Sequence, residues 1–307
     1  MPTPAALVAS LHPILSQIIP LPSPRARNMA QICTNCVEGH RLPGEPKGTL
    51  LPTIAPLDAY FISGHGTTEV PSSASFTKTK NAIVIMTDIF GLSIPNLKVV
   101  ADILASQLNT DVWVPDIFRG NTPVREDAIS DLIFDEPGKA LSWWQTIRKY
   151  IVYMRAMPAL KSFRPDIQDP WAIEFLTNLR SEYKYDKITV VGYCWGGGIA
   201  VRLATRPKLV DSVIAVHPSG QFKDDMIKTQ VPIAFFIAEE DHQWDPEAAV
   251  LVQETWKLQE EVPKHLFKTY KGTVHGFGSR PNLSIPQVKK SWEQLMGDIV
   301  SWLKETM

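Results

Sequence analysis

The sequence predicts a single α/β domain with a mostly parallel central sheet and helices on both faces. Short apolar runs rich in Ile and Val alternate with stretches of helical periodicity, which is typical of successive βαβ units. The chain has 307 residues, of which 44% are hydrophobic and 21% charged, as in ordinary globular proteins. No repeat or low-complexity tract breaks the alternation after residue 60.

The first half of the domain begins with a strand inside Asn81–Gly91, whose apolar run suits burial on both faces. A helix follows from Pro95, with apolar residues at helical spacing. Residues 111–120 predict a second strand that Pro115 stops. Residues 120–140 have no clean period and carry turn signals, so we expect a surface excursion near the strand ends.

The second half continues the same alternation. Its predicted helices cover Leu141–Met157, Trp171–Tyr183 and 246–261, and another follows the stretch around Cys194 and runs to about Thr205. A further helix closes the C-terminus, and its buried face includes Val288, Leu295 and Trp302. Its predicted strands lie within 187–191, 211–218, 232–241 and 264–272.

The stretch "GYCWGGG" joins a predicted strand to a predicted helix. Gly192 and Gly196 flank Cys194 in the pattern G-x-nucleophile-x-G, which holds a nucleophile on a sharp strand-to-helix turn. The helix start would favour a thiolate and later an oxyanion, with the amides of Trp195 and Ile89 as donors. The alternative is that Cys194 is a buried hydrophobe, as free cysteines often are.

An acid and a histidine follow the cysteine in chain order. The strand "PIAFFIAEED" ends at Asp241, and His275 follows the last strand in "GTVHGFG". Nucleophile, acid and histidine occur in this order in α/β-hydrolases, where the acid orients the histidine and the histidine moves the proton. Taken singly, Asp241 could cap a helix and His275 could lie in a surface loop; together they predict a triad.

These motifs, with "DIFG" at Asp88–Gly91, make the chain from about Asp58 resemble the dienelactone hydrolase family, the cysteine branch of the α/β-hydrolases. With "CTNC" near its start and "AVHPSG" after the strand that follows the turn, the chain resembles the fungal members more than the bacterial ones. It implies the α/β-hydrolase fold and metal-independent hydrolysis of a small lactone or ester, with no cofactor. It also implies that Cys194 attacks the carbonyl, His275 shuttles the proton and Asp241 orients His275.

The resemblance also implies roles around the triad. Bacterial members have a glutamate at the position of Asp88, which helps to deprotonate the thiol; capping of the next turn is the alternative here. Arg280 lies one position from a substrate arginine of those proteins. Arg119 and Arg125 are other candidate cations, and all three could be solvated surface residues. We expect His217 either to line the pocket or to be a hydrogen-bonded structural histidine. The tryptophans are expected to form an aromatic wall of the pocket or to pack in the core: Trp143, Trp144, Trp195 and Trp244.

Charge and composition narrow the partners. With 31 basic and 32 acidic residues, the net charge of −1 shows no excess of positive charge that would attract nucleic acid or an anionic membrane. Three cysteines do not make a secreted disulfide scaffold, so we expect a cytoplasmic protein. Cys33 and Cys36 lack a second ligand pair for zinc, so no metal is expected. The oligomeric state is left open.

The chain start differs from the rest. Residues 1–30 are rich in proline and lack Asp and Glu, so we expect an extension ahead of a domain over 31–307. If residues 1–28 form a transit peptide, the compartment is mitochondrial. Two alternatives to hydrolysis remain. One is lactonisation, retro-aldol or thioester-release chemistry on the same scaffold, and the other is a non-catalytic binding protein.

Overall fold

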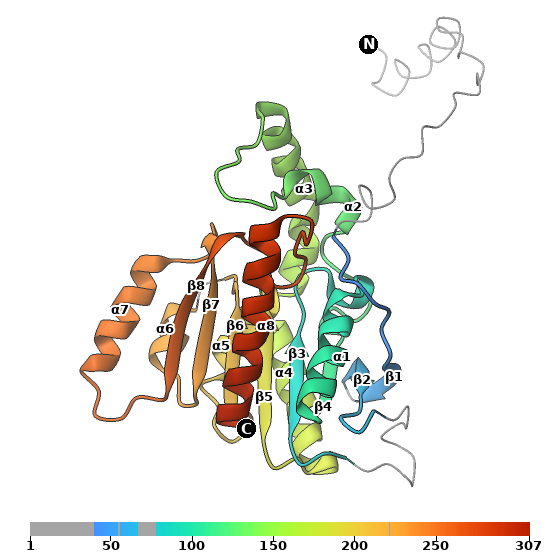
Figure 1. Cartoon of the computed structure of the whole chain (residues 1–307), viewed down its shortest axis with the longest axis vertical. Coiled ribbons are helices and arrows are strands. Elements are labelled where there is room, and N and C mark those ends of the chain that lie inside the picture. Colours follow the sequence, from blue (N-terminus) through green and yellow to red (C-terminus); the bar gives the residue numbers. More distant parts are fainter. Residues whose placement is uncertain (1–39, 55, 67–77, 221) are drawn as a thin grey trace, which may run out of the picture. The chain divides into compact units, whose positions relative to one another are not determined.

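The computed structural model describes residues 40–54, 56–66, 78–220 and 222–307. The predicted extension over residues 1–30, with Cys33 and Cys36, lies outside them. The described part contains an eight-stranded sheet in the order β1-β2-β4-β3-β5-β6-β7-β8 (Figure 1). Strands β3 to β8 run parallel, and the β1–β2 and β2–β4 pairs are antiparallel. The predicted fold class is confirmed.

The strands are short, and most are apolar. They are β1 (Thr49–Ile54), β2 (Leu57–Ile62), β3 (Ala82–Met86), β4 (Asp111–Pro115), β5 (Ile188–Tyr193), β6 (Ser212–Val216), β7 (Ile233–Glu240) and β8 (His265–Val274). Strands β3 to β6 are buried at every position, as expected of parallel strands covered on both faces.

The helices connect these strands. They are α1 (Asn96–Leu108), α2 (Glu126–Ile129), α3 (Trp143–Ser162), α4 (Pro165–Asn178), α5 (Trp195–Leu203), α6 (Lys223–Ile227), α7 (Pro246–Lys257) and α8 (Pro286–Thr306). Short 3-10 turns occupy Gly91–Ser93 and Ser130–Leu132, and a π turn occupies Leu179–Tyr183.

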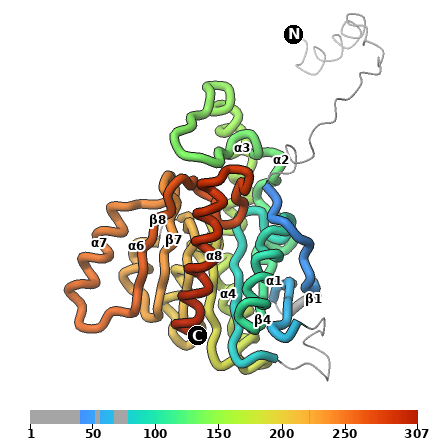
Figure 2. The backbone as a smooth tube through the Cα atoms, viewed as in Figure 1, coloured from blue at the N-terminus to red at the C-terminus, as the bar shows by residue number. Residues whose placement is uncertain are grey.

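The sheet lies between two layers of helices (Figure 2). Helices α1 and α8 pack with one hydrophobic core, which includes Val100, Leu295 and Trp302. Helices α4 to α7 contribute to the core on the other face, which includes Phe175 and Trp256. The predicted buried face of the C-terminal helix is therefore confirmed.

Some element boundaries differ from the prediction. The helix expected at Trp171–Tyr183 begins at Pro165, because a proline is favourable in the first turn, and it ends in the π turn. Helix α3 continues past Met157 to Ser162 despite Pro158. The antiparallel β1–β2 hairpin had no counterpart among the predicted strands. Among the described residues, no helix is long and apolar enough to cross a membrane.

Candidate active site

Cys194 lies at the turn between β5 and α5. Its backbone has φ 51° and ψ −111°, a conformation that non-glycine residues adopt at an energetic cost. A Cβ on Gly192 would lie 2.2 Å from the Gly196 carbonyl oxygen, and one on Gly196 would lie 2.2 Å from that of Met86. Both glycines are therefore needed for the strand–helix crossing, as the sequence pattern predicts.

The structure brings Cys194, His275 and Asp241 together. The Sγ atom of Cys194 lies 3.1 Å from Nε2 of His275. On the other side of the ring, Nδ1 is 2.8 Å and 2.9 Å from the two carboxylate oxygens of Asp241. Asp241 directly follows β7 and His275 directly follows β8, so two adjacent parallel strands present these side chains at the same edge of the sheet.

The neighbours of His275 favour the protonated form of its ring. Burial lowers the pKa of His275, but the charge of Cys194 and the hydrogen bonds to Asp241 and Cys194 outweigh it and raise the pKa to about 10. The Asp241 side chain is only 1% exposed, so its contact with Nδ1 is shielded from water. The arrangement favours a protonated His275 ring held between the Cys194 sulfur and the Asp241 carboxylate.

The backbone around the thiol is held in register by hydrogen bonds. The Gly196 amide donates to the Thr87 carbonyl at 3.0 Å, which joins the start of α5 to the loop after β3. Trp195 directly precedes Gly196 in the chain, and Ile89 follows Thr87 by two residues. Neither amide donates to another group of the described chain, so both are available to a developing oxyanion.

Asp88 and Arg280 lie beside this loop. Asp88 is buried and accepts a hydrogen bond from the Phe90 amide at 3.0 Å. This bond caps the following turn, which is the role considered above as the alternative to thiol activation. Burial raises the pKa of Asp88, while Arg280 and Ser279 act in the opposite direction. The Arg280 guanidinium lies over the Phe90 ring at 4.5 Å. Within the described residues, no hydrogen bond joins Asp88 to Cys194.

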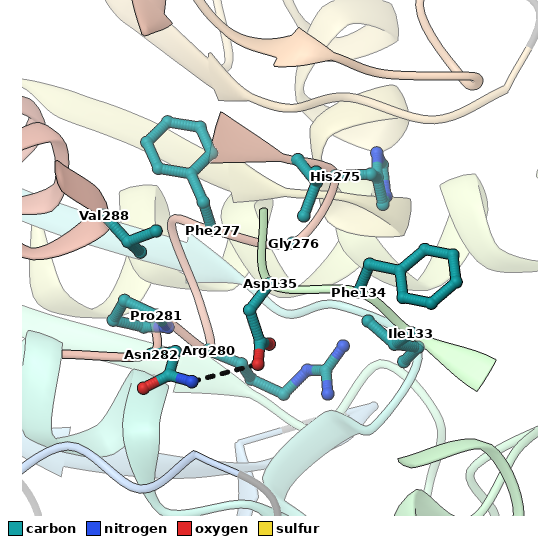
Figure 3. Close-up of a pocket in the computed structure, with 11 residues that line it drawn as sticks. Ile133, Phe134, Asp135, His275, Gly276, Phe277, Arg280, Pro281, Asn282 and Val288 are labelled. Atoms are coloured by element: carbon teal, nitrogen blue, oxygen red, sulfur yellow. Dashed lines mark hydrogen bonds between the residues drawn. The ribbon is translucent and has the colours of Figure 1, made fainter. Parts of the chain in front are cut away.

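A small pocket adjoins His275 (Figure 3). Arg280 lines it, and its buried Nε atom has no hydrogen-bond partner among the described residues. The other wall comes from Ile133, Phe134 and Asp135 of the predicted excursion. Asn282 donates to Asp135 at 3.0 Å and joins the two walls.

The other two candidate cations do not line this pocket. Arg119 lies over the Trp171 ring at 4.9 Å and is absent from the pocket wall. Arg125 is exposed and forms two hydrogen bonds with Asp127, 3.1 Å and 3.0 Å long. Of the three arginines, the structure therefore brings only Arg280 to the pocket.

His217 and the tryptophans occupy several environments. His217 is completely buried, and its ring lies edge to face with that of His275. Trp195 packs against the core, and its Nε1 donates to Gln168. Trp244 also packs against the core, whereas Trp143 and Trp144 are exposed and stacked on each other. None of the four tryptophans lines the pocket.

Some residues near the thiol had no clear signal in the sequence. Ser219 Oγ lies 3.7 Å from the Cys194 Sγ, and the Ser219 amide donates to the Cys194 carbonyl at 3.0 Å. Its position after a strand, two residues beyond His217, is the only hint. Phe134 and Asp135 come from the irregular excursion, whose lack of period hides their contacts. In the described part of the chain, no His, Cys, Asp or Glu side chains cluster in a way that suits a metal.

Comparisons with known proteins identify the family of the chain. The sheet and the strand–turn–helix at Cys194 define an α/β-hydrolase. The model of the dienelactone hydrolase family matches residues 70–307, and the chain belongs to that family. It is therefore a lactone or ester hydrolase acting on a small molecule. The predicted family is confirmed.

Individual relatives cover most of the chain. It is 29% identical over 273 residues to "Hydrolase tropI" of Talaromyces stipitatus, covering 89% of this chain and 95% of the relative. It is 26% identical to the "Carboxymethylenebutenolidase homolog" of Mus musculus, and the match covers 73% of this chain and 82% of the relative. The crystal structure of a dienelactone hydrolase from Anabaena variabilis aligns with TM-score 0.51 and 11% identity, over 86% of this chain and all of the other, and shows the fold alone.

Proposed function

We propose that the protein hydrolyses a small lactone or carboxylic ester through a covalent acyl-thioester on Cys194. The observation that carries this proposal is the continuous contact from Sγ through the His275 ring to Asp241, with distances of 3.1 Å and 2.8 Å. Nucleophile, proton carrier and orienting acid are within hydrogen-bonding reach, as nucleophilic catalysis requires.

In the first half-reaction, the Cys194 thiolate attacks the substrate carbonyl. The amides of Trp195 and Ile89 donate to the oxyanion of the tetrahedral intermediate. The intermediate collapses, the C–O bond breaks, and the His275 imidazolium gives its Nε2 proton to the departing alkoxide. For a lactone, the alcohol remains attached and the ring opens.

In the second half-reaction, neutral His275 takes a proton from water through Nε2. The resulting hydroxide attacks the thioester, and the second intermediate expels the Cys194 thiolate. The products are a carboxylic acid and an alcohol, and the thiolate–imidazolium pair is restored. Asp241 keeps Nδ1 protonated throughout, so that Nε2 faces the thiol and the water.

The pocket supports a small, negatively charged substrate. Arg280 supplies a cation beside His275, and its Nε lacks a partner among the described residues. We therefore assign Arg280 to a carboxylate of the substrate, and Asp88 to the support of Arg280.

Turnover of an aryl ester, followed together with the mass of the protein, tests the mechanism. During turnover we expect an acyl adduct on Cys194, which hydroxylamine removes. Cys194→Ala should abolish the adduct and lower kcat by about 10⁴-fold, and His275→Ala should lower kcat by about 10³-fold or more. Iodoacetamide should label Cys194. If Cys194→Ala keeps its activity, or the adduct forms on another residue, the proposal is wrong.

A further inference from the structure

Helix α3 exposes its apolar side. Seven large apolar or aromatic side chains on it are between 43% and 69% exposed: Trp143, Trp144, Ile147, Tyr150, Ile151, Tyr153 and Met154. At 100° per residue, they occupy one half of the helix surface. The only buried residue of α3, Ala156, lies on the opposite side. The helix thus has the reverse of the usual globular arrangement, in which the apolar face covers the core.

Basic residues accompany this apolar face. Helix α3 contains no Asp or Glu, and it carries Arg148, Lys149, Arg155 and Lys161. On the helical wheel, Arg148 and Arg155 lie at one edge of the apolar face, and Lys149 lies at the other. All four are exposed, and only Arg148 has an acidic partner among the described residues, Asp131.

We propose that this outward face of α3 docks on the surface of an anionic lipid bilayer. Tryptophan and tyrosine prefer the boundary between lipid headgroups and acyl chains, where the ring is buried and its polar atom stays wet. Helices that lie in this boundary carry aromatic and aliphatic residues on one face and Lys or Arg beside it, as α3 does. The charge of the face is complementary to acidic headgroups.

The same charges disfavour another occupant. Pairing two copies of the chain through this face would bring basic residues together with no acidic residue of α3 to neutralise them. The aliphatic side chains of Ile147 and Met154 near the centre of the face, with Ile151 beside them, offer nothing to a phosphate backbone. A lipid surface satisfies both the apolar centre and the basic edges.

The placement of α3 leaves the face accessible. Figure 1 shows the helix at the end of the sheet where the catalytic loops lie, with its first turns projecting away from the strands. Arg148 and Gln145 contact Asp131, so the helix is joined to the segment that continues to the pocket wall at Ile133. The whole-chain charge balance predicted no membrane partner, and this proposal departs from it because the basic residues are concentrated on one helix.

Vesicle flotation of the full chain tests the proposal. We expect binding to phosphatidylcholine vesicles that contain phosphatidylserine, weaker binding to phosphatidylcholine alone, and loss of binding as salt is raised. The double variant Lys149→Gln with Arg155→Gln should bind the anionic vesicles about tenfold more weakly. The double variant Trp144→Gln with Ile151→Gln should lose binding to both kinds of vesicle.

Helix α7 offers a matched control. Val250 and Leu251 are 58% and 47% exposed there, so Val250→Gln with Leu251→Gln removes two exposed apolar side chains from another helix and should leave binding unchanged. All variants should retain hydrolysis of a soluble aryl ester, which verifies folding. The proposal is overturned if wild type does not float, if the α3 variants float like wild type, or if sedimentation equilibrium shows a dimer that Trp144→Gln with Ile151→Gln dissociates.

Discussion

The rings of His217 and His275 meet edge to face, with centroids 5.0 Å apart. His217 is completely buried, and neither of its ring nitrogens has a hydrogen-bond partner among the described residues. Burial, followed by the nearby charge of His275, keeps the pKa of His217 well below its usual value. His217 therefore favours its neutral form, and we expect it to act by packing against the His275 ring.

Replacement of His217 by Phe tests this packing role. We expect the free energy of unfolding to stay within about 1 kcal/mol of wild type, since relief of the unpaired nitrogens offsets the cost of Phe at φ 37°. The pH profile of kcat should be unchanged. His217→Ala should lose about 2–3 kcal/mol through the cavity it leaves, as urea unfolding would measure. A displaced pH profile in His217→Phe would mean that His217 handles protons.

The pKa of His275 should depend on Cys194. NMR titration of the ring should give a value near 10 in wild type, and a lower one in Cys194→Ala, because the thiolate charge is removed. This pKa is raised from 6.5, so the stability that His275 contributes is complete below pH 6.5 and is lost as the pH rises through about 10. Equal values in the two proteins would rule out the thiolate–imidazolium pair.

Gly196 should tolerate no side chain. In Gly196→Ala, the new Cβ would meet the Met86 backbone at 2.2 Å, and we expect a loss of about 3 kcal/mol in unfolding free energy together with most activity. Gly297 in α8 is the control, because a Cβ there meets nothing within 4 Å. Gly297→Ala should stabilise by about 0.5–1 kcal/mol, since alanine favours helix. Thermal unfolding of the two variants measures the contrast, which a stable, active Gly196→Ala would contradict.

Asp88→Asn separates a role in thiol activation from a role beside Arg280. The amide oxygen can still accept from the Phe90 amide, so the turn should keep its cap. We expect the rate of Cys194 alkylation by iodoacetamide to stay within about twofold of wild type. The KM for anionic esters should rise, because Arg280 loses the carboxyl group that supports it beside the pocket. A large fall in the alkylation rate would instead assign thiol activation to Asp88.

Arg280 should determine the preference for charged substrates. Arg280→Gln should raise the KM for esters that carry a carboxylate by about 10–100-fold, the range expected for a lost charge-assisted hydrogen bond. Neutral esters should be affected far less. Arg125→Gln is the matched control, since Arg125 is exposed and paired with Asp127. Steady-state kinetics on paired neutral and anionic esters would reveal an equal loss on both, which would contradict the assignment.

Much of the fold was predictable because its signals are local. The apolar runs at Ala82–Met86 and Ile188–Tyr193 read as buried strands by their composition alone. The glycines around Cys194 predict a tight strand-to-helix turn. The order of Cys194, Asp241 and His275 in the chain follows the order of the strands that carry them. The helix boundary near Pro165 was missed because the stretch from Pro165 to Pro170 looks like a loop.

The sequence by itself determined the parallel strands of the sheet, the turn at Cys194 and the three residues that can form a triad, since each depends on residues near one another in the chain. Only the tertiary structure selected Arg280 over Arg119 and Arg125, because a cation's partner comes from distant segments. It also placed Ile133, Phe134 and Asp135 against His275, and it turned the apolar side of α3 outward. Helical periodicity identifies a face, but which way that face points depends on how the whole chain packs.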